Sequence, residues 1–216
     1  PPESIAPAPV YDKYINVKAY FYGTHPDTKQ IKCMRNGKYS HTMYEESILK
    51  HKKVTKRYLD MIALLTNGIY VGDDKHLPSE KMVIYVSTKA MATEVTNYLN
   101  KLYGEKYVIK RFISEDPYSN VFESHIIVST PLSLGTAHDI ADLRFILLTT
   151  AIGKEDTNEQ LKSRLRRLKN NPTVNPTMYY LVNRDVNKHI VYHRKKRENF
   201  KSTTLSQEEF NTPLRG

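Results

Sequence analysis

From Lys81 onward, short apolar runs alternate with helix-forming segments, and this alternation constrains the fold more than any other feature of the sequence. The runs are rich in β-branched and aromatic residues and have the length of strands buried on both faces. They are MVIYVS (82–87), YVIKRFI (107–113), HIIVST (125–130), RFILLT (144–149) and MYYLV (178–182). Amphipathic helices are predicted at Thr88–Leu102 and at about Thr157–Lys169. Because right-handed crossovers connect such strands in parallel, the predicted fold is α/β, a mainly parallel sheet with helices on both faces.

The predicted core covers about residues 80–183, and additions on both sides extend the domain to 14–203. A half-buried strand is expected at Tyr14–Tyr22, and helices are expected at Ser40–Ile48 and Lys53–Leu65. The remaining expectations concern loops and ends: loops at 67–68 and 72–74, a Pro-rich linker at 1–13, a basic C-terminal helix at about 186–203 and a disordered tail at 204–216.

The charge balance favours a polyanionic partner. The chain has 33 Lys and Arg against 23 Asp and Glu, a formal net charge of +10, which suits nucleic acid, although a soluble basic surface without a partner is the alternative. Two basic stretches, Lys50–Arg57 and Arg184–Lys201, are candidates for DNA contact or solvated faces. With the single Cys33, no apolar run of membrane-spanning length and no secretory signal, we expect an intracellular protein without a metal site.

Two strand ends offer polar groups where ligands bind in open α/β sheets. Ser87, Thr88 and Lys89 follow the first buried run and combine two hydroxyls, a cation and a helix start, which suits a phosphate, although a helix cap is the commoner use of such residues. STPLSLGTAHDI (129–140) is a loop in which Asp139 could accept a bond from a ribose hydroxyl. Asp139 could also cap a turn.

A third segment, Glu155–Lys169, combines an acidic start with a basic end. Arg164 and Arg167 are three residues apart, so a continuous helix would place them on one face. Two guanidinium groups on one face can bind phosphate oxygens through forked hydrogen bonds. A solvated basic face with ordinary ion pairs explains the same pattern.

In this order, the three segments resemble the second RecA-like domain of superfamily 2 helicases. MVIYVSTKAMATEVTNYL is similar to motif IV and its helix, IIVSTPLSLGTAHDI to motif V, and QLKSRLRRL to motif VI. The likeness covers about residues 80–170 and is greatest to phage-type DNA helicases. The sequence departs from the family pattern at four positions: Ala137, Leu161, Ser163 and Arg166.

The resemblance implies a role for each matching residue. Arg164 and Arg167 are the implied catalytic residues, arginine fingers that reach the γ-phosphate of ATP, and Asp139 and Gln160 are the implied nucleotide-binding residues. The implied nucleic-acid contacts are Ser87, Thr88, Lys89, Thr130, Gly135 and Thr136.

No G-x-x-x-x-G-K-[ST] loop and no D-E-x-[DH] box occurs in the chain. We therefore expect a missing N-terminal RecA-like domain of the same polypeptide to bind most of the ATP and Mg²⁺, so that this piece alone is inactive. The predicted function is the C-terminal motor domain of an ATP-dependent DNA helicase or translocase, with RNA possible, in replication, recombination or repair. If it is viral, it would work in the host cytoplasm. The alternative is a non-enzymatic, basic nucleic-acid-binding α/β module.

Overall fold

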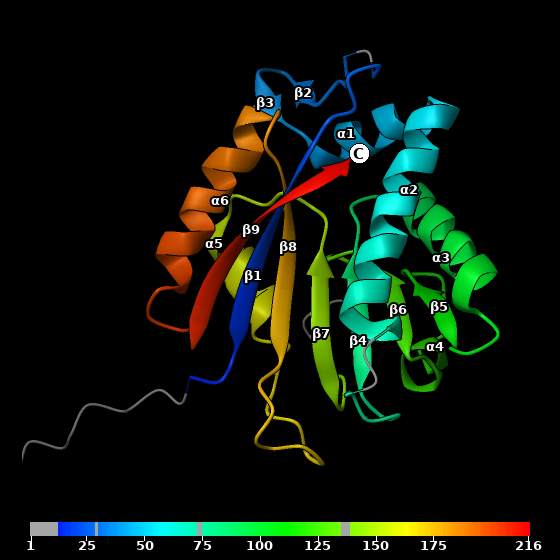
Figure 1. Cartoon of the computed structure of the whole chain (residues 1–216), viewed down its shortest axis with the longest axis vertical. Coiled ribbons are helices and arrows are strands. Elements are labelled where there is room, and N and C mark those ends of the chain that lie inside the picture. The colour runs from blue at the N-terminus through cyan, green and yellow to red at the C-terminus, as the bar shows by residue number, and fades with distance from the viewer. Residues whose placement is uncertain (1–12, 29, 73–74, 135–138) are drawn as a thin grey trace, which may run out of the picture.

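A computed structural model describes residues 13–28, 30–72, 75–134 and 139–216. Its main feature is a seven-stranded sheet in the order β5-β6-β4-β7-β8-β1-β9, in which every neighbouring pair is parallel (Figure 1). The strands are β1 (Asn16–Gly23), β4 (Lys81–Tyr85), β5 (Ile109–Phe112), β6 (Ile126–Ser129), β7 (Leu143–Leu148), β8 (Thr177–Asn183) and β9 (Ser206–Arg215). The parallel α/β sheet predicted from the alternation is confirmed.

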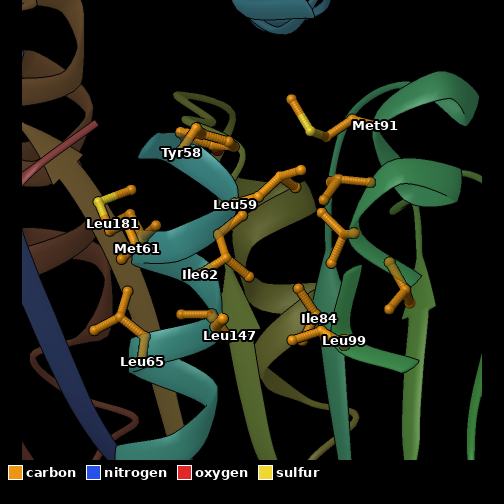
Figure 2. Close-up of a cluster of buried hydrophobic side chains, with 14 of the residues drawn as sticks. Tyr58, Leu59, Met61, Ile62, Leu65, Ile84, Met91, Leu99, Leu147 and Leu181 are labelled. Carbon is orange, nitrogen blue, oxygen red and sulfur yellow. The ribbon is translucent and has the colours of Figure 1, made fainter. Parts of the chain in front are cut away.

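Helices cover both faces of this sheet. One face carries α1 (His41–Leu49), α2 (Lys52–Thr66) and α3 (Lys89–Tyr103), and the other carries α4 (Ser119–Glu123), α5 (Glu155–Lys162) and α6 (Asn187–Phe200). Each face has its own apolar layer, because successive strand residues point to opposite sides. In β4, Ile84 packs toward α2 and α3 (Figure 2), whereas Val83 packs on the other side.

Helix α3 shows how the local sequence fixes an element. The Thr88 hydroxyl accepts a hydrogen bond from the Met91 amide at 3.0 Å and so caps the first turn. Met91, Val95 and Leu99 recur at helical spacing and are buried against the sheet. The predicted helix at Thr88–Leu102 is confirmed to within one residue at each end.

A short hairpin between β1 and α1 was not predicted. Strands β2 (Met34–Arg35) and β3 (Lys38–Tyr39) pair antiparallel, and Asn36 and Gly37 form the turn with φ angles of 51° and 73°. A two-residue hairpin turn favours positive φ at both positions, which Asn and Gly adopt at low cost. At its base, the Tyr39 hydroxyl bonds to His41 and His189, so the hairpin is anchored to α1 and α6.

The last residues of the chain form β9, so the prediction of a disordered tail at 204–216 was wrong. Strand β9 pairs with β1 from Asn16–Ser206 onward, and the Gly216 amide bonds to the Gly23 carbonyl at 2.9 Å. Partly buried Phe210, Thr212 and Leu214 alternate with exposed residues, which is the pattern of an edge strand. The sequence of this tail is as polar as that of a disordered segment. In the structure, however, it forms hydrogen bonds with the backbone groups along the edge of β1.

Two other predictions required correction. Residues 67–68, expected as a loop, belong to a π-helical turn, η1 (Asn67–Val71), which continues α2. The helix expected at Thr157–Lys169 ends at Lys162. Residues 1–12 of the predicted linker and residues 73–74 lie outside the described residues. Within the described ranges, no helix combines the length and apolar character that a membrane span requires.

Candidate functional site

A pocket of about 740 Å³ lies between the segment that connects β6 to β7 and helix α5. Three of the predicted site residues, Asp139, Gln160 and Arg164, line it. Asp139 follows β6, Gln160 lies in α5 and Arg164 comes just after α5, so the fold rather than the local sequence brings them together. The full lining consists of Pro131, Leu132, Asp139, Thr157, Glu159, Gln160, Leu161, Ser163, Arg164 and Arg166.

The second arginine of this pocket is Arg166 rather than Arg167. Since α5 ends at Lys162, Arg164 and Arg167 do not share a helix face, and that expectation was wrong. Arg167 lies over the ring of Tyr14 at 4.9 Å, and its Nη1 donates to the Pro172 carbonyl at 3.5 Å. Beyond the end of α5, Leu165 and Leu168 reach the core from an irregular segment.

The ion pair between Arg166 and Asp139 in this pocket is exposed to solvent. Arg166 Nη2 lies 3.7 Å from Asp139 Oδ1, with the two side chains 67% and 81% exposed, so this contact can rearrange around a ligand. Arg164 is half-buried. Burial raises the pKa of Tyr85 at the end of β4, and the positive charge of Arg164 opposes that rise. Arg164 therefore sits toward the sheet, while Arg166 faces solvent.

This set of groups suits a phosphorylated ligand. Two guanidinium groups can donate forked hydrogen bonds to phosphate oxygens, and Gln160 and Thr157 add an amide and a hydroxyl. Asp139 can accept a bond from a sugar hydroxyl. Among the described residues, no three His, Cys, Asp or Glu side chains are grouped closely enough to hold a metal ion.

The loop after β6 begins with a closed polar turn. Thr130 Oγ1 bonds to Ser133 Oγ at 2.8 Å and accepts from the Ser133 amide at 3.0 Å, and Thr130 is nearly buried. Its hydroxyl is thus engaged within the chain. Gly135 and Thr136, the other predicted contacts in this loop, lie outside the described residues.

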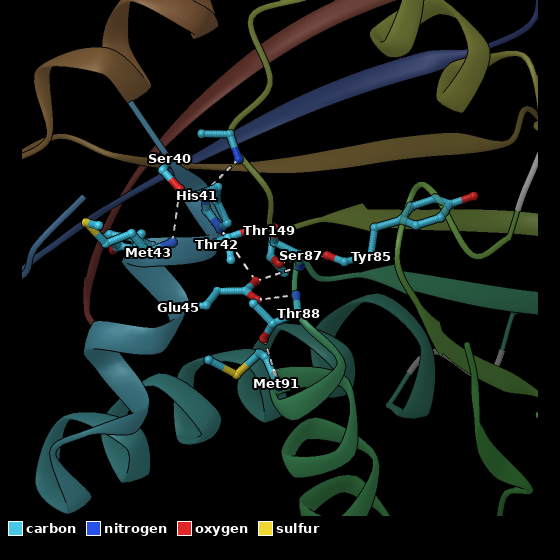
Figure 3. A network of polar contacts seen from close by, with 12 residues as sticks. Ser40, His41, Thr42, Met43, Glu45, Tyr85, Ser87, Thr88, Met91 and Thr149 are labelled. Atoms are coloured by element: carbon cyan, nitrogen blue, oxygen red, sulfur yellow. Dashed lines mark hydrogen bonds and ion pairs between the residues drawn. The ribbon is translucent and has the colours of Figure 1, made fainter. Parts of the chain in front are cut away.

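At the end of β4, a buried carboxylate binds the backbone amides of Ser87 and Thr88, two of the residues predicted to contact a phosphate. The Glu45 side chain from α1 is fully buried, and its two oxygens accept from the Ser87 amide at 2.8 Å and the Thr88 amide at 2.7 Å (Figure 3). The Ser87 hydroxyl bonds to Thr42 at 3.0 Å, and Lys89 forms an ion pair with Glu115. The Thr88 hydroxyl acts as a cap, and none of the three residues lines the pocket.

Neither a family model nor a curated protein sequence matches the chain. Solved structures do match. The chain is similar to Mss116p DEAD-box helicase domain 2 bound to an RNA duplex, with a TM-score of 0.55 and 13% identity over 91% of this chain and 64% of that one. It is similar to T4 UvsW, with a TM-score of 0.57 and 12% identity over 92% of this chain and 41% of that one. For S. cerevisiae Dbp5 bound to RNA and ADP BeF3, the TM-score is 0.52 at 12% identity over 90% and 41%.

The chain has a RecA-like α/β fold. At these identities the likeness concerns the fold, and the chain spans less than two thirds of the length of each of these structures. In this RecA-like fold the pocket lies on the face of the sheet that carries α4, α5 and α6.

Helix α6 of this RecA-like fold buries some of its basic side chains. His189, His193 and Lys196 are buried on its inner face, and Lys196 Nζ donates to the Ile152 carbonyl at 2.8 Å. Arg197 forms an ion pair with Glu209 at 2.5 Å. Lys196 belongs to the stretch predicted as a candidate for DNA contact, but because it is buried, a nucleic-acid strand cannot reach it.

Lys196 makes the stability of the protein depend on pH. Burial lowers the pKa of this lysine to about 7, whereas a lysine in an unfolded chain titrates near 10.4. Between these values the unfolded state binds more protons, so stability rises with pH. The penalty of the buried ammonium is present in full below pH 7. In Lys196→Met this penalty is gone, and the Ile152 carbonyl still accepts from Asn158.

We expect Lys196→Met to be more stable than the wild type at pH 6–7. Its advantage in unfolding free energy should narrow by roughly 2–3 kcal/mol between pH 7 and pH 9. Urea titrations at each pH measure this difference, with exposed Lys195→Met as the matched control. If the difference in unfolding free energy between Lys196→Met and the wild type stayed constant from pH 7 to pH 9, the lowered pKa of Lys196 would be contradicted.

Proposed function

We propose that the chain is the C-terminal RecA-like lobe of an ATP-driven helicase or translocase. The observation that carries the proposal is the pocket, which brings Asp139 from the β6–β7 connection together with Gln160 and Arg164 from α5 and the residues just after it. The fold supports it, because one similar structure is a helicase domain bound to an RNA duplex and another contains RNA and ADP BeF3. These ligands are properties of those proteins, and they come to this chain as part of the proposal.

ATP would lie between this pocket and an ATP-binding RecA-like lobe that holds most of the nucleotide. Arg164 donates from the half-buried side of the pocket to the γ-phosphate oxygens and stabilises the charge that develops during phosphoryl transfer. Gln160 positions the phosphates, and Asp139 accepts from the sugar. Mg²⁺, when bound, neutralises phosphate charge, and we place its ligands on the other lobe. Arginine fingers of this kind contribute about 10³–10⁵ in rate.

We assign the second cationic role to Arg166. The family resemblance implied Arg167, but Arg167 is engaged with Tyr14 and Pro172 and does not line the pocket. Arg166 lines the same pocket as Arg164, and its weak contact with Asp139 can exchange for phosphate oxygens. ATP binding would therefore release Asp139 for the sugar.

We further propose that DNA is the nucleic-acid partner, with RNA as the alternative, and that it binds along the carboxyl edge of the sheet. Closure of the two lobes on ATP and their opening after hydrolysis would shift the strand. Because the amides of Ser87 and Thr88 are bonded to Glu45, the loop after β4 would reach a strand phosphate through side chains, with Lys89 the most exposed of them.

The test compares ATP hydrolysis by the isolated chain with that of the polypeptide in which it is joined to its ATP-binding lobe. We expect no turnover from the isolated chain, and turnover stimulated by DNA or RNA from the joined protein. Turnover by the isolated chain, or a joined protein that binds nucleic acid without hydrolysing ATP, would contradict the proposal. The second outcome would favour a non-enzymatic binding module.

A further inference from the structure

A basic hollow of about 610 Å³ lies at the corner between α1 and α2, away from the nucleotide pocket. Lys50, His51, Lys52 and Lys53 stand in sequence along it, and all four are exposed. Its lining residues are Asp27, Thr28, Lys50, His51, Lys52, Lys53, Val54 and Arg57. This is a concentrated positive charge in one concave surface.

Lys50, Lys52 and Lys53 have no counter-ion among the residues that the structure describes. Arg57, at the inner side of the hollow, is paired with Asp27 at 2.7 Å and donates to Thr28 at 2.8 Å. By contrast, Lys50, Lys52 and Lys53 make no ion pair and no side-chain hydrogen bond within the described part of the chain. Asp27, the one carboxylate among the described residues that line the hollow, is therefore already engaged.

Helix stability does not explain this cluster. Lys52 and Lys53 occupy the first turn of α2, which has no acidic residue, and cations are unfavourable at the positive end of a helix dipole. Mutual repulsion of the lysines adds to this cost. An external polyanion would remove both unfavourable contributions at once.

The hollow continues toward the end of β4. Lys52 also lines a second hollow of about 470 Å³ between α2 and α3, and Ala90 of that hollow is the neighbour of Lys89. Both α2 and α3 begin at the edge of the sheet where the strands end (Figure 1). The cations from Lys50 to Lys89 thus follow one path along this edge.

The second hollow adds apolar surface to the path. Leu49, Leu59 and Tyr98 line it beside the lysines. Unpaired bases can pack on such side chains while their phosphates meet the lysines, whereas the bases of a duplex are stacked inside the helix and cannot. The combination favours a single strand.

We propose that Lys50, Lys52 and Lys53 bind the phosphates of single-stranded nucleic acid and extend the strand path from Lys89 across the α1–α2 corner. This rests on the proposed function for the presence of a strand at the carboxyl edge. The surface recognises backbone charge and unstacked bases, so it has little preference for sequence.

Fluorescence anisotropy of a labelled 20-nucleotide oligo(dT) with the 216-residue chain, between 50 and 200 mM salt, tests the path. Each phosphate contact of a single strand contributes about 0.7 to the slope of log affinity against log salt. We expect Lys50→Ala/Lys52→Ala/Lys53→Ala to reduce that slope by about 2. The matched control, Lys101→Ala/Lys106→Ala/Lys169→Ala, removes the same charge from exposed positions at the opposite edge, and its slope should stay near that of the wild type.

Three results would overturn the inference: equal slopes for the two triple variants, tighter binding of a 20-base-pair duplex than of oligo(dT), or equal displacement by poly-glutamate of matching charge. Circular dichroism of each variant verifies that it is folded. The lysine substitutions leave Arg164 untouched, so a failure here is separable from a failure of ATP hydrolysis in the joined protein.

Discussion

Replacing Arg164 with alanine is expected to lower the nucleic-acid-stimulated ATPase rate of the joined protein by about 10³-fold, the lower end of the range for arginine fingers. Arg164 is the half-buried arginine of the pocket, and its side chain lies toward the end of β4. A group placed there can meet charge that develops on the transferred phosphoryl group. Because the substitution removes an interaction of the transition state, it should reduce kcat far more than ATP affinity.

Steady-state kinetics with saturating nucleic acid measure this effect, and three variants calibrate it. Arg164→Lys keeps the positive charge but loses the paired hydrogen bonds that a guanidinium group donates, so it should recover only part of the ATPase rate. Arg167→Ala should cost less than about tenfold, since Arg167 is placed outside the pocket. Exposed Arg194→Ala on α6 should have no effect. A larger loss for Arg167→Ala than for Arg164→Ala would reverse the assignment of the two arginines.

Glu45→Ala should lower the unfolding free energy by about 3–5 kcal/mol, because two backbone amides lose a charged acceptor and a fully buried side chain is removed. Glu45 joins α1 to the end of β4, so its loss should also loosen the start of α3. Chemical denaturation monitored by circular dichroism gives the value. Glu45→Gln keeps the shape and one acceptor, and it should cost less.

The neighbouring Glu46 offers a matched control. It lies on the same helix, is exposed, and its side chain makes no hydrogen bond or ion pair within the described residues, so Glu46→Ala should change stability by less than about 0.5 kcal/mol. Similar losses for the two substitutions would mean that the effect comes from helix propensity. In that case the bonds to Ser87 and Thr88 would contribute little to the fold.

The parts of the fold that could be predicted are those with strong periodicity. Runs such as MVIYVS are buried on both faces of the sheet and are apolar at successive positions, so their sequence identifies them directly. Strand β9 has one open edge and carries Glu208 and Glu209, so its sequence resembles a polar tail. Its partner β1 lies about 190 residues earlier, and no local pattern records that pairing.

The candidate site could be predicted only in part. Asp139, Gln160 and Arg164 stand at strand ends or on a helix, and the fold brings them into one pocket. The assignment of Arg166 rather than Arg167 depends on where α5 ends, and the acidic start and basic end of Glu155–Lys169 do not show that the helix stops at Lys162. The role of Glu45 could not be predicted from the sequence, because its partners Ser87 and Thr88 lie more than 40 residues away along the chain.

The most direct measurement is a structure of the joined protein with ADP BeF3 and a nucleic-acid strand. We expect the Arg164 guanidinium to lie about 3 Å from the group that replaces the γ-phosphate, with Arg166 beside it and Asp139 turned toward the sugar. A nucleotide bound far from this pocket, with Arg164 still directed at the end of β4, would contradict the proposed motor function.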